Sequence, residues 1–250
     1  MAFLDNYITS FESISLEEMD SVSLMKRVDT KFVFNRSLLE EIFPLLVDQY
    51  KLLYVNDVVK SKYTSLYFDT KDFKFFMNHH NGKLNRSKVR FREYIDSQVS
   101  FLEVKRKNPK GKTIKKRIQV DLPTKTLNLD QKQFIKNRLK EDYDLLYCHT
   151  NFFHRITMVN KFLKERITID FDLRFESEKK TIKDETNHIV IAELKQEKLD
   201  RTSFFYKLMK ENSIRPSSMS KYCIGTSLLN KDLKSNRFKK NFRFLKKNNH

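Results

Sequence analysis

Cationic side chains recur at every second position in several short segments of this sequence. In Arg86–Tyr94, for example, Arg90 and Arg92 alternate with Val89 and Phe91. Guanidinium and ammonium groups gathered on one face suit a polyanionic ligand. Phosphate oxygens match them best, because they offer several acceptors at high charge density. The spacing therefore predicts a phosphate-binding surface.

A period of two is that of a β-strand, which places alternate residues on one face. The polar sides of the other alternating segments hold Arg27, Asp29 and Lys31; Glu103, Lys105 and Lys107; Lys115, Arg117, Gln119 and Asp121; Arg166, Thr168, Asp170, Asp172 and Arg174; and Ile191, Glu193 and Lys195. Any single strand of this kind could simply present its charges to water. Like charges opposite one another repel, however, so six such strands favour a bound polyanion.

Helical patterns separate the strands. They cover Arg36–Gln49, Asp72–His80, Lys132–Lys140, Thr202–Asn212 and Lys221–Leu229, and the second begins at an Asp72 cap and ends near Gly82. These helices need an apolar surface, which the strands supply, so the polar strand faces point away from them. If the sheet closes into a barrel, those faces line its interior. That interior must hold water, because each unpaired buried cation costs several kcal/mol.

Composition narrows the class of protein. The formal net charge is +18, and 13% of the 250 residues are aromatic, too many for a disordered basic chain. No apolar stretch is long enough to span a bilayer. The two cysteines, Cys148 and Cys223, do not require a disulfide framework, which favours a reducing cytoplasm. We expect a cytoplasmic protein, with membrane association through a partner left open.

The chain divides by charge into a domain at 1–230 and a basic tail at 231–250. The tail holds eight basic residues and one acid, interleaved with aromatic residues such as Phe238 and Phe242. Such a segment could contact an anionic membrane surface, a membrane protein, nucleic acid or an acidic partner, or it could be a solvated end. The tail does not carry the functional interpretation.

An ordered set of motifs resembles a known family. The set comprises Arg27-Val-Asp-Thr-Lys31-Phe, Leu66-Tyr-Phe-Asp-Thr70, Arg86-x-Lys-Val-Arg90-Phe-Arg92-x-Tyr94, Phe101-Leu-Glu-Val-Lys105, Lys115-Lys-Arg117, Phe153-His-Arg155, Arg166-Ile-Thr-Ile-Asp170, Ala192-Glu193-Leu-Lys195 and Ser220-Lys221-Tyr222. It is similar to the VTC polyphosphate polymerase domain (vacuolar transporter chaperone) and its bacterial relatives, within the CYTH-like triphosphate tunnel metalloenzyme superfamily. The resemblance implies an α+β fold, a closed antiparallel β-barrel of about eight strands with helices outside.

The resemblance also implies an activity and its residues. The enzyme would transfer the γ-phosphoryl of ATP onto a growing polyphosphate chain, with Mn²⁺ or Mg²⁺ as cofactor and ATP and polyphosphate as partners. The implied phosphate-binding residues are Lys31, Arg90, Arg92, Lys105, Lys115, Arg117, Arg155, Arg166, Lys195 and Lys221. Glu193 would hold the metal. The catalytic set is Lys31, Arg90, Arg92, Lys105, Arg155, Arg166 and Glu193.

One departure separates this chain from the hydrolases of the superfamily. Their first strand alternates two glutamates and a lysine, whereas Arg27, Asp29 and Lys31 stand here. The resemblance therefore favours a polymerase over a hydrolase that uses two metals. A tripolyphosphatase or nucleoside triphosphatase and a noncatalytic polyphosphate or inositol-phosphate sensor remain alternatives. A nucleic-acid binder is not expected, because a narrow tunnel could not admit a duplex and no RRM, helix-turn-helix or zinc-finger spacing is present.

Several individual residues could instead have structural roles. Glu103 and Lys105 could belong to cross-strand ion pairs. Asp170 and Asp172 could bind a metal or could neutralise Arg166 and Arg174. Histidines are expected to be structural or at the surface. Tyr67 and Tyr94 are expected to pack in the barrel, and not to stack on a base.

Overall fold

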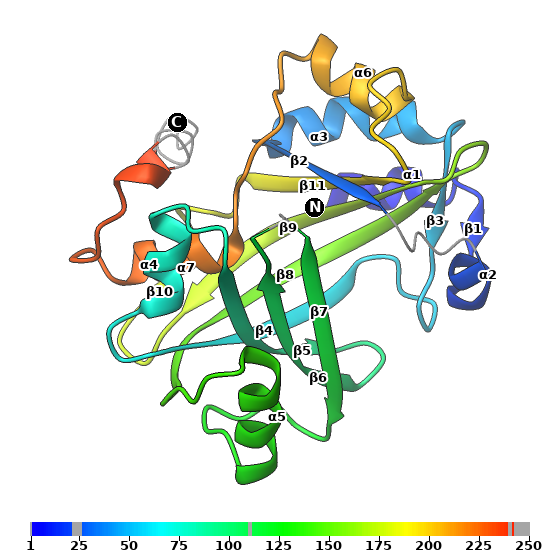
Figure 1. The fold of residues 1–250 in the computed structure, drawn as a ribbon. Helices are drawn as coiled ribbons and strands as arrows, with labels where there is room; N and C mark the ends of the chain where they lie inside the picture. Colours follow the sequence, from blue (N-terminus) through cyan, green and yellow to red (C-terminus); the bar gives the residue numbers. More distant parts are fainter. Residues whose placement is uncertain (1, 22–26, 110–111, 240–241, 243–250) are drawn as a thin grey trace. The chain divides into compact units, whose positions relative to one another are not determined.

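The computed structural model describes residues 2–21, 27–109, 112–239 and 242 (Figure 1). The helices are η1 (Ala2–Leu4), α1 (Asp5–Ile8), α2 (Leu16–Ser21), α3 (Arg36–Ile42), η2 (Pro44–Leu46), α4 (Lys74–His80), α5 (Leu129–Leu139), α6 (Phe204–Glu211), α7 (Lys221–Leu229) and η3 (Asn236–Phe238). The strands are β1 (Ser13–Ile14), β2 (Val28–Asn35), β3 (Tyr50–Leu53), β4 (Ser61–Asp69), β5 (Arg86–Tyr94), β6 (Val99–Lys107), β7 (Thr113–Val120), β8 (Leu146–Asn160), β9 (Glu165–Glu176), β10 (Thr181–Ile182) and β11 (Ile189–Gln196).

The strands form an α+β fold with one hydrogen-bonded sheet. The main order is β2-β11-β9-β8-β4-β5-β6-β7, with β1, β3 and β10 off this path, eleven strands in all. The closed barrel of about eight strands is therefore a wrong prediction. Within the described residues the order ends at β2 and β7, and no ladder joins these two strands. Alternation of polar and apolar residues is the same in an open and a closed sheet, so it could not decide closure.

The chain divides into two compact units, each described here by itself. Unit 1 comprises residues 1–62, 153–173 and 186–219. Its core lies where α3 and α6 cover one face of β2, β9 and β11. Phe32 of β2 packs edge-on against Phe205 of α6, with ring centroids 5.9 Å apart. The opposite face of these strands carries the polar residues.

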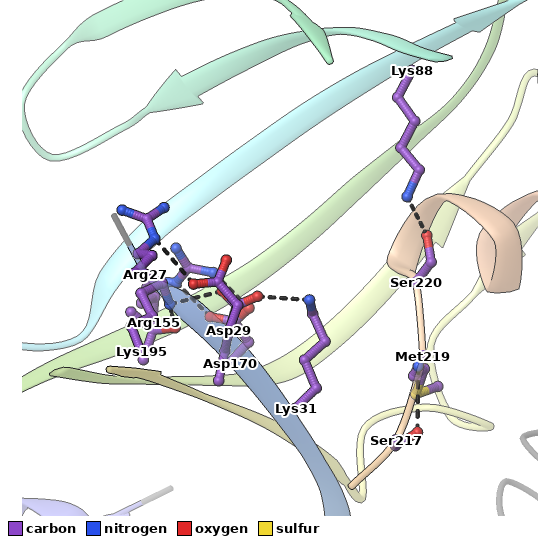
Figure 2. A network of polar contacts seen from close by, with 12 residues as sticks. Arg27, Asp29, Lys31, Lys88, Arg155, Asp170, Lys195, Ser217, Met219 and Ser220 are labelled. Atoms are coloured by element: carbon purple, nitrogen blue, oxygen red, sulfur yellow. Dashed lines mark hydrogen bonds and ion pairs between the residues drawn. The ribbon is translucent and has the colours of Figure 1, made fainter. Parts of the chain in front are cut away.

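Unit 2 comprises residues 63–152, 174–185 and 220–250. Val89 and Phe91 of β5 and Leu102 and Val104 of β6 lie buried in one cluster with α5 residues including Ile135. The helix therefore covers the apolar face, as the alternation predicts. In contrast, α7 contacts the polar face of this sheet, where the Lys88 ammonium donates to Ser220 Oγ at 2.8 Å (Figure 2).

Several predicted elements are confirmed, two of them with the predicted bounds: β5 and α7. The helix predicted at Arg36–Gln49 is shorter, since it ends at Ile42 and gives way to η2 at Pro44. A proline cannot continue the hydrogen-bond ladder of an α-helix. Strands β4 and β8 were not predicted, because much of each is buried on both faces and does not alternate.

The predicted cap of α4 is wrong. Asp69 accepts the backbone N–H groups of Phe75 and Phe76 at 2.9 Å, whereas Asp72 accepts the Thr70 hydroxyl. Phe73, just before the helix, has φ 55°, so the chain turns back and brings the N-terminus of α4 to the end of β4.

The cysteines and the C-terminal segment bear on the remaining predictions from the sequence. Cys148 and Cys223 are free thiols. Phe238, near the start of the predicted tail, packs against Phe76 with ring centroids 5.8 Å apart, while 240–241 and 243–250 lie outside the described residues. In the part of the chain that the structure covers, no helix is long and apolar enough to cross a membrane. The division into 1–230 and 231–250 stays a prediction.

Candidate phosphate-binding site

A row of polar side chains crosses four strands of unit 2. Each member of the row lies directly opposite the next on the neighbouring strand: Tyr67 on β4, Arg90 on β5, Glu103 on β6 and Arg117 on β7. Directly paired residues share a face of the sheet. The strand alternation seen in the sequence therefore converges here on one surface.

Glu103 is the carboxylate at the centre of this row. Its side chain is 1% exposed, and its Oε2 accepts from Arg90 Nη2 at 2.6 Å and Nε at 2.9 Å. Its Oε1 pairs with the Lys115 ammonium. Burial by itself would raise the pKa of Glu103, but Arg90 and Lys115 outweigh it and hold the pKa well below its usual value. Glu103 thus stays ionised and fixes two cations.

A neighbouring row brings three lysines together. Lys88, Lys105 and Lys115 are opposite one another on β5, β6 and β7. Repulsion from Arg90, together with burial, holds the pKa of Lys105 well below its usual value. Lys105 makes no hydrogen bond or ion pair with any residue that the structure describes. Like charges in register destabilise a sheet, so this row is unfavourable unless other groups offset its charge.

The remaining predicted residues of unit 2 lie around these rows. Arg92 is 5% exposed and lies over the Tyr63 ring, 5.4 Å from its centroid. Arg117 is exposed and lies 4.2 Å from the centroid of Phe101. Lys221 is the first residue of α7, directly after Ser220. The strands β5, β6 and β7 and the helix α7, which contacts their polar face, thus carry all six predicted cations of this unit: Arg90, Arg92, Lys105, Lys115, Arg117 and Lys221.

A second group forms around Glu193 in unit 1, and Figure 2 labels its lysines, Lys31 and Lys195. Glu193 on β11 is directly opposite Lys31 on β2 and Thr168 on β9. Its Oε1 lies 2.6 Å from the Lys31 ammonium and its Oε2 lies 2.7 Å from the Lys195 ammonium. Burial by itself would raise the pKa of Glu193, but Lys195 and Lys31 hold it well below its usual value.

Lys195 is the most enclosed cation of the second group. It is 5% exposed and also donates to Thr168 Oγ1 at 2.9 Å. Burial lowers the pKa of Lys195 to about 8, although the Glu193 carboxylate opposes the shift. On the paired strand, Arg166 lies directly opposite Lys195.

The carboxylates of unit 1 have specific cationic partners. Arg155 binds Asp170 through two hydrogen bonds, Nε to Oδ1 at 2.5 Å and Nη2 to Oδ2 at 2.7 Å. Arg27 pairs with Asp29 at 3.0 Å. Asp170 therefore neutralises an arginine, and Arg155 is a partner that it binds. His154, which binds Asp172 at 3.0 Å, is not a part of the group around Glu193.

The donor set determines how a divalent cation would fit. Among the described residues no three His, Cys, Asp or Glu side chains gather as a metal site. Glu193 offers one carboxylate, and Lys31 and Lys195 already contact its two oxygens. A hard cation such as Mg²⁺ can be bound by one carboxylate and substrate phosphates with retained waters. The residues therefore fit a cation that arrives with a triphosphate, and not a preformed protein site.

Sequence reasoning found the cations but missed their neutral partners. The structure adds Tyr67, whose hydroxyl accepts from Arg90 at 3.2 Å, Thr168 and Ser220. The motif positions of Tyr67 and Ser220 were visible in the sequence, but a hydroxyl has no charge pattern to single it out. The structure brings the predicted residues together as one group in each unit.

The fold and these groups define a class: an α+β protein whose antiparallel sheet presents cations around single carboxylates. The VTC domain model matches residues 26–230. The chain belongs to the VTC domain family. A search of curated proteins found no match.

Solved structures are similar to this chain at low identity. A putative adenylyl cyclase from Hippeastrum, with a dominant triphosphatase activity, has a TM-score of 0.51 at 14% identity over 81% of this chain and 96% of its own. A putative adenylate cyclase from Bacillus halodurans has a TM-score of 0.49 at 13% identity over 78% of this chain and 94% of its own. The first of these similarities supports the fold alone.

Proposed function

We propose that this protein is a polyphosphate polymerase that transfers the γ-phosphoryl of ATP onto a growing inorganic polyphosphate chain. The observation that carries the proposal is the row of three lysines, Lys88, Lys105 and Lys115, in direct register. In a sheet that faces only solvent, three ammonium groups in register would repel one another, whereas a chain of phosphates would neutralise them. Membership of the VTC domain family supports the same chemistry.

The chemistry asks little covalent work of the protein. Phosphoryl transfer passes through a loose transition state, so catalysis consists of positioning and charge stabilisation. Arg90, Arg92, Arg155 and Arg166 would bind triphosphate oxygens, while Lys105, Lys115 and Lys221 would bind the acceptor phosphate and the product chain. The fixed guanidinium of Arg90, held by Glu103, needs no reorganisation when the phosphate arrives.

A divalent cation, Mn²⁺ or Mg²⁺, would neutralise charge on the transferring phosphates when it is bound. Glu193 would be its protein ligand, with substrate oxygens completing the coordination. Lys31 and Lys195, which share Glu193 in the free protein, would then be released toward phosphate oxygens. We place the enzyme in the cytoplasm, with a membrane or membrane-protein partner for the basic tail as a further proposal.

The second candidate is a triphosphatase that hydrolyses tripolyphosphate or nucleoside triphosphates. The Hippeastrum protein with triphosphatase activity has a similar fold, which keeps this alternative open. Against it, Asp29 is engaged by Arg27 at 3.0 Å. An acid already paired with an arginine is poorly placed to bind a second metal or to activate water.

The deciding experiment is incubation of the purified full chain with ATP and Mn²⁺, with product length read on a polyacrylamide gel. We expect polyphosphate many residues long. Release of orthophosphate alone would support the triphosphatase and overturn the polymerase.

A variant pair separates enzyme from sensor. Glu193→Gln should abolish polymer formation, whereas the exposed Glu197→Gln, just after the same strand, should leave it unchanged. A sensor would produce no polymer in any variant and would bind polyphosphate without metal. In that outcome the proposed activity is wrong, although the phosphate site remains.

A further inference from the structure

Tyr67 occupies a special place in the row that crosses unit 2. It is 3% exposed and lies on β4 directly opposite Arg90. Its neighbours Leu66 and Phe68 belong to the apolar cluster on the other face of the sheet. The Tyr67 side chain therefore shares the polar face with Arg90 and Glu103.

The Tyr67 hydroxyl has one bonding position left unused. Its oxygen accepts a hydrogen bond from Arg90 Nη1 at 3.2 Å. Its own O–H finds no acceptor among the residues that the structure describes. The buried Tyr222, in contrast, donates its O–H to Asp69. The Tyr67 hydroxyl thus already accepts from Arg90, and its O–H is the donor that it has left for a ligand.

The charges around Tyr67 specify what that ligand is. Burial by itself would raise the pKa of Tyr67, but Arg90, Arg92 and Lys88 outweigh it and hold the pKa below its usual value. Glu103, the carboxylate of this row, is occupied by Arg90 and Lys115. An acceptor that enters among these cations must be anionic, and phosphate oxygens suit both the cations and the phenol.

The Tyr67 ring is held in place by its neighbours. It packs in tilted contacts against Tyr222, with ring centroids 5.2 Å apart, and against His149 at 5.1 Å. Tyr222 is in turn fixed by its bond to Asp69. A hydroxyl fixed in this way is preorganised, so binding does not require the ring to be ordered.

A second hydroxyl on the same strand points to the same conclusion. Ser65, two residues before Tyr67, is directly opposite Arg92 and is fully buried. Its Oγ has no hydrogen-bond partner within the described part of the chain. Strand β4 thus presents two hydroxyl groups beside two arginines, with donors that the described residues do not use.

We propose that the Tyr67 hydroxyl is a phosphate ligand that donates a hydrogen bond to a phosphate oxygen bound beside Arg90. The proposal rests on the proposed function only in that phosphate binds at this row. It adds to the cationic set a neutral donor of fixed direction. Such a donor selects for an acceptor at a defined position, which a flexible lysine cannot do.

The test is calorimetric titration of the full chain with inorganic tripolyphosphate. Tyr67→Phe keeps the ring and removes the donor, and we expect its affinity to fall about tenfold, as for one hydrogen bond to a charged group. The control is Tyr143→Phe, whose hydroxyl bonds to Glu141 on the same unit. Its affinity and melting temperature should match those of the wild type. An unchanged affinity in Tyr67→Phe would overturn the proposal.

A second measurement tests the proposal if the Tyr67→Phe variant does not fold. Fluorotyrosine placed at position 67 of the full chain should show a fluorine NMR shift when tripolyphosphate is added, and no shift would overturn the proposal. Both readouts report binding and not turnover. If the wild type binds tripolyphosphate through Tyr67 but makes no polymer, the proposed function fails and this inference stands. If it makes polymer and Tyr67→Phe binds as tightly, only this inference fails.

Discussion

At the scale of single residues, each unit has a group of cations that a carboxylate fixes in the free protein. Glu193 contacts two lysines and Glu103 contacts an arginine and a lysine. Removing either carboxylate would leave buried positive charge without compensation, which is costly. Each acid therefore holds its group of cations together in the free protein.

Lys195 should take up protons when a polyanion binds. Its pKa of about 8 means that about half of the ammonium groups are deprotonated at pH 8. A polyanion beside Lys195 favours the charged form and raises this pKa, so Lys195 should contribute as much as about half a proton to the uptake on binding. Calorimetric titration with tripolyphosphate in two buffers of different ionisation enthalpy measures this uptake at pH 8.

The matched variants for this measurement are Lys195→Met and Lys198→Met. Lys198 is exposed and lies just beyond β11, so its replacement should leave the uptake unchanged. Lys195→Met should lower it, although other lysines with lowered pKa, such as Lys105, retain a share. Equal uptake in wild type and Lys195→Met would contradict the expectation.

At the scale of elements, Asp69 joins three parts of unit 2. It ends β4, accepts backbone N–H groups at the start of α4, and accepts the Tyr222 hydroxyl from α7. Burial raises the pKa of Asp69, while these hydrogen bonds oppose the shift. Through Tyr222, this one carboxylate sets the end of α7 that carries Ser220 and Lys221 toward the cationic face.

Replacement of Asp69 should destabilise the protein more than replacement of Asp72. Asp69→Ala removes the acceptor for the helix and leaves the Tyr222 hydroxyl without its partner, so we expect a loss of about 2–3 kcal/mol in the free energy of unfolding. Asp72→Ala removes an exposed bond to Thr70 and should cost less than about 0.5 kcal/mol. Urea unfolding measures both. Equal losses would restore Asp72 as the important cap.

At the scale of the whole molecule, the formal net charge of +18 makes any polyanion attractive. Specific binding must therefore be separated from general attraction. Contacts with phosphate through screened surface charges weaken steeply with salt, whereas enclosed groups such as Lys195 and Glu103 are less screened. The choice of polyanion and of salt concentration is thus part of any test.

Tripolyphosphate should stabilise the folded protein. A ligand at one hundred times its dissociation constant contributes about 2.7 kcal/mol, which corresponds to a rise of roughly 5–10 °C in Tm for a chain of this size. Scanning calorimetry measures the rise. Duplex DNA at the same phosphate concentration is the control, and its smaller effect should vanish at high salt. An equal effect of both polyanions would favour a nucleic-acid binder.

The sequence by itself determined which residues face which way. Alternation in β5 predicted that Arg90 and Arg92 lie on one face of the strand and Val89 and Phe91 on the other. The structure confirms this, because side chains on a strand must alternate. The helix at Lys221–Leu229 follows from a local pattern of residues, and the family resemblance follows from the order of motifs along the chain. No pairing between strands is needed to predict any of these features.

Only the tertiary structure decided which residues meet across strands. The pairing of Glu103 with Arg90 and Lys115, the binding of Asp170 by Arg155, and the unused donor of Tyr67 all depend on register. The open ends of the sheet at β2 and β7 and the capping of α4 by Asp69 depend on contacts between distant segments or on a turn of the chain. Periodicity reports the face of a side chain but not its partner, because the partner is set by how strands and helices pack in three dimensions.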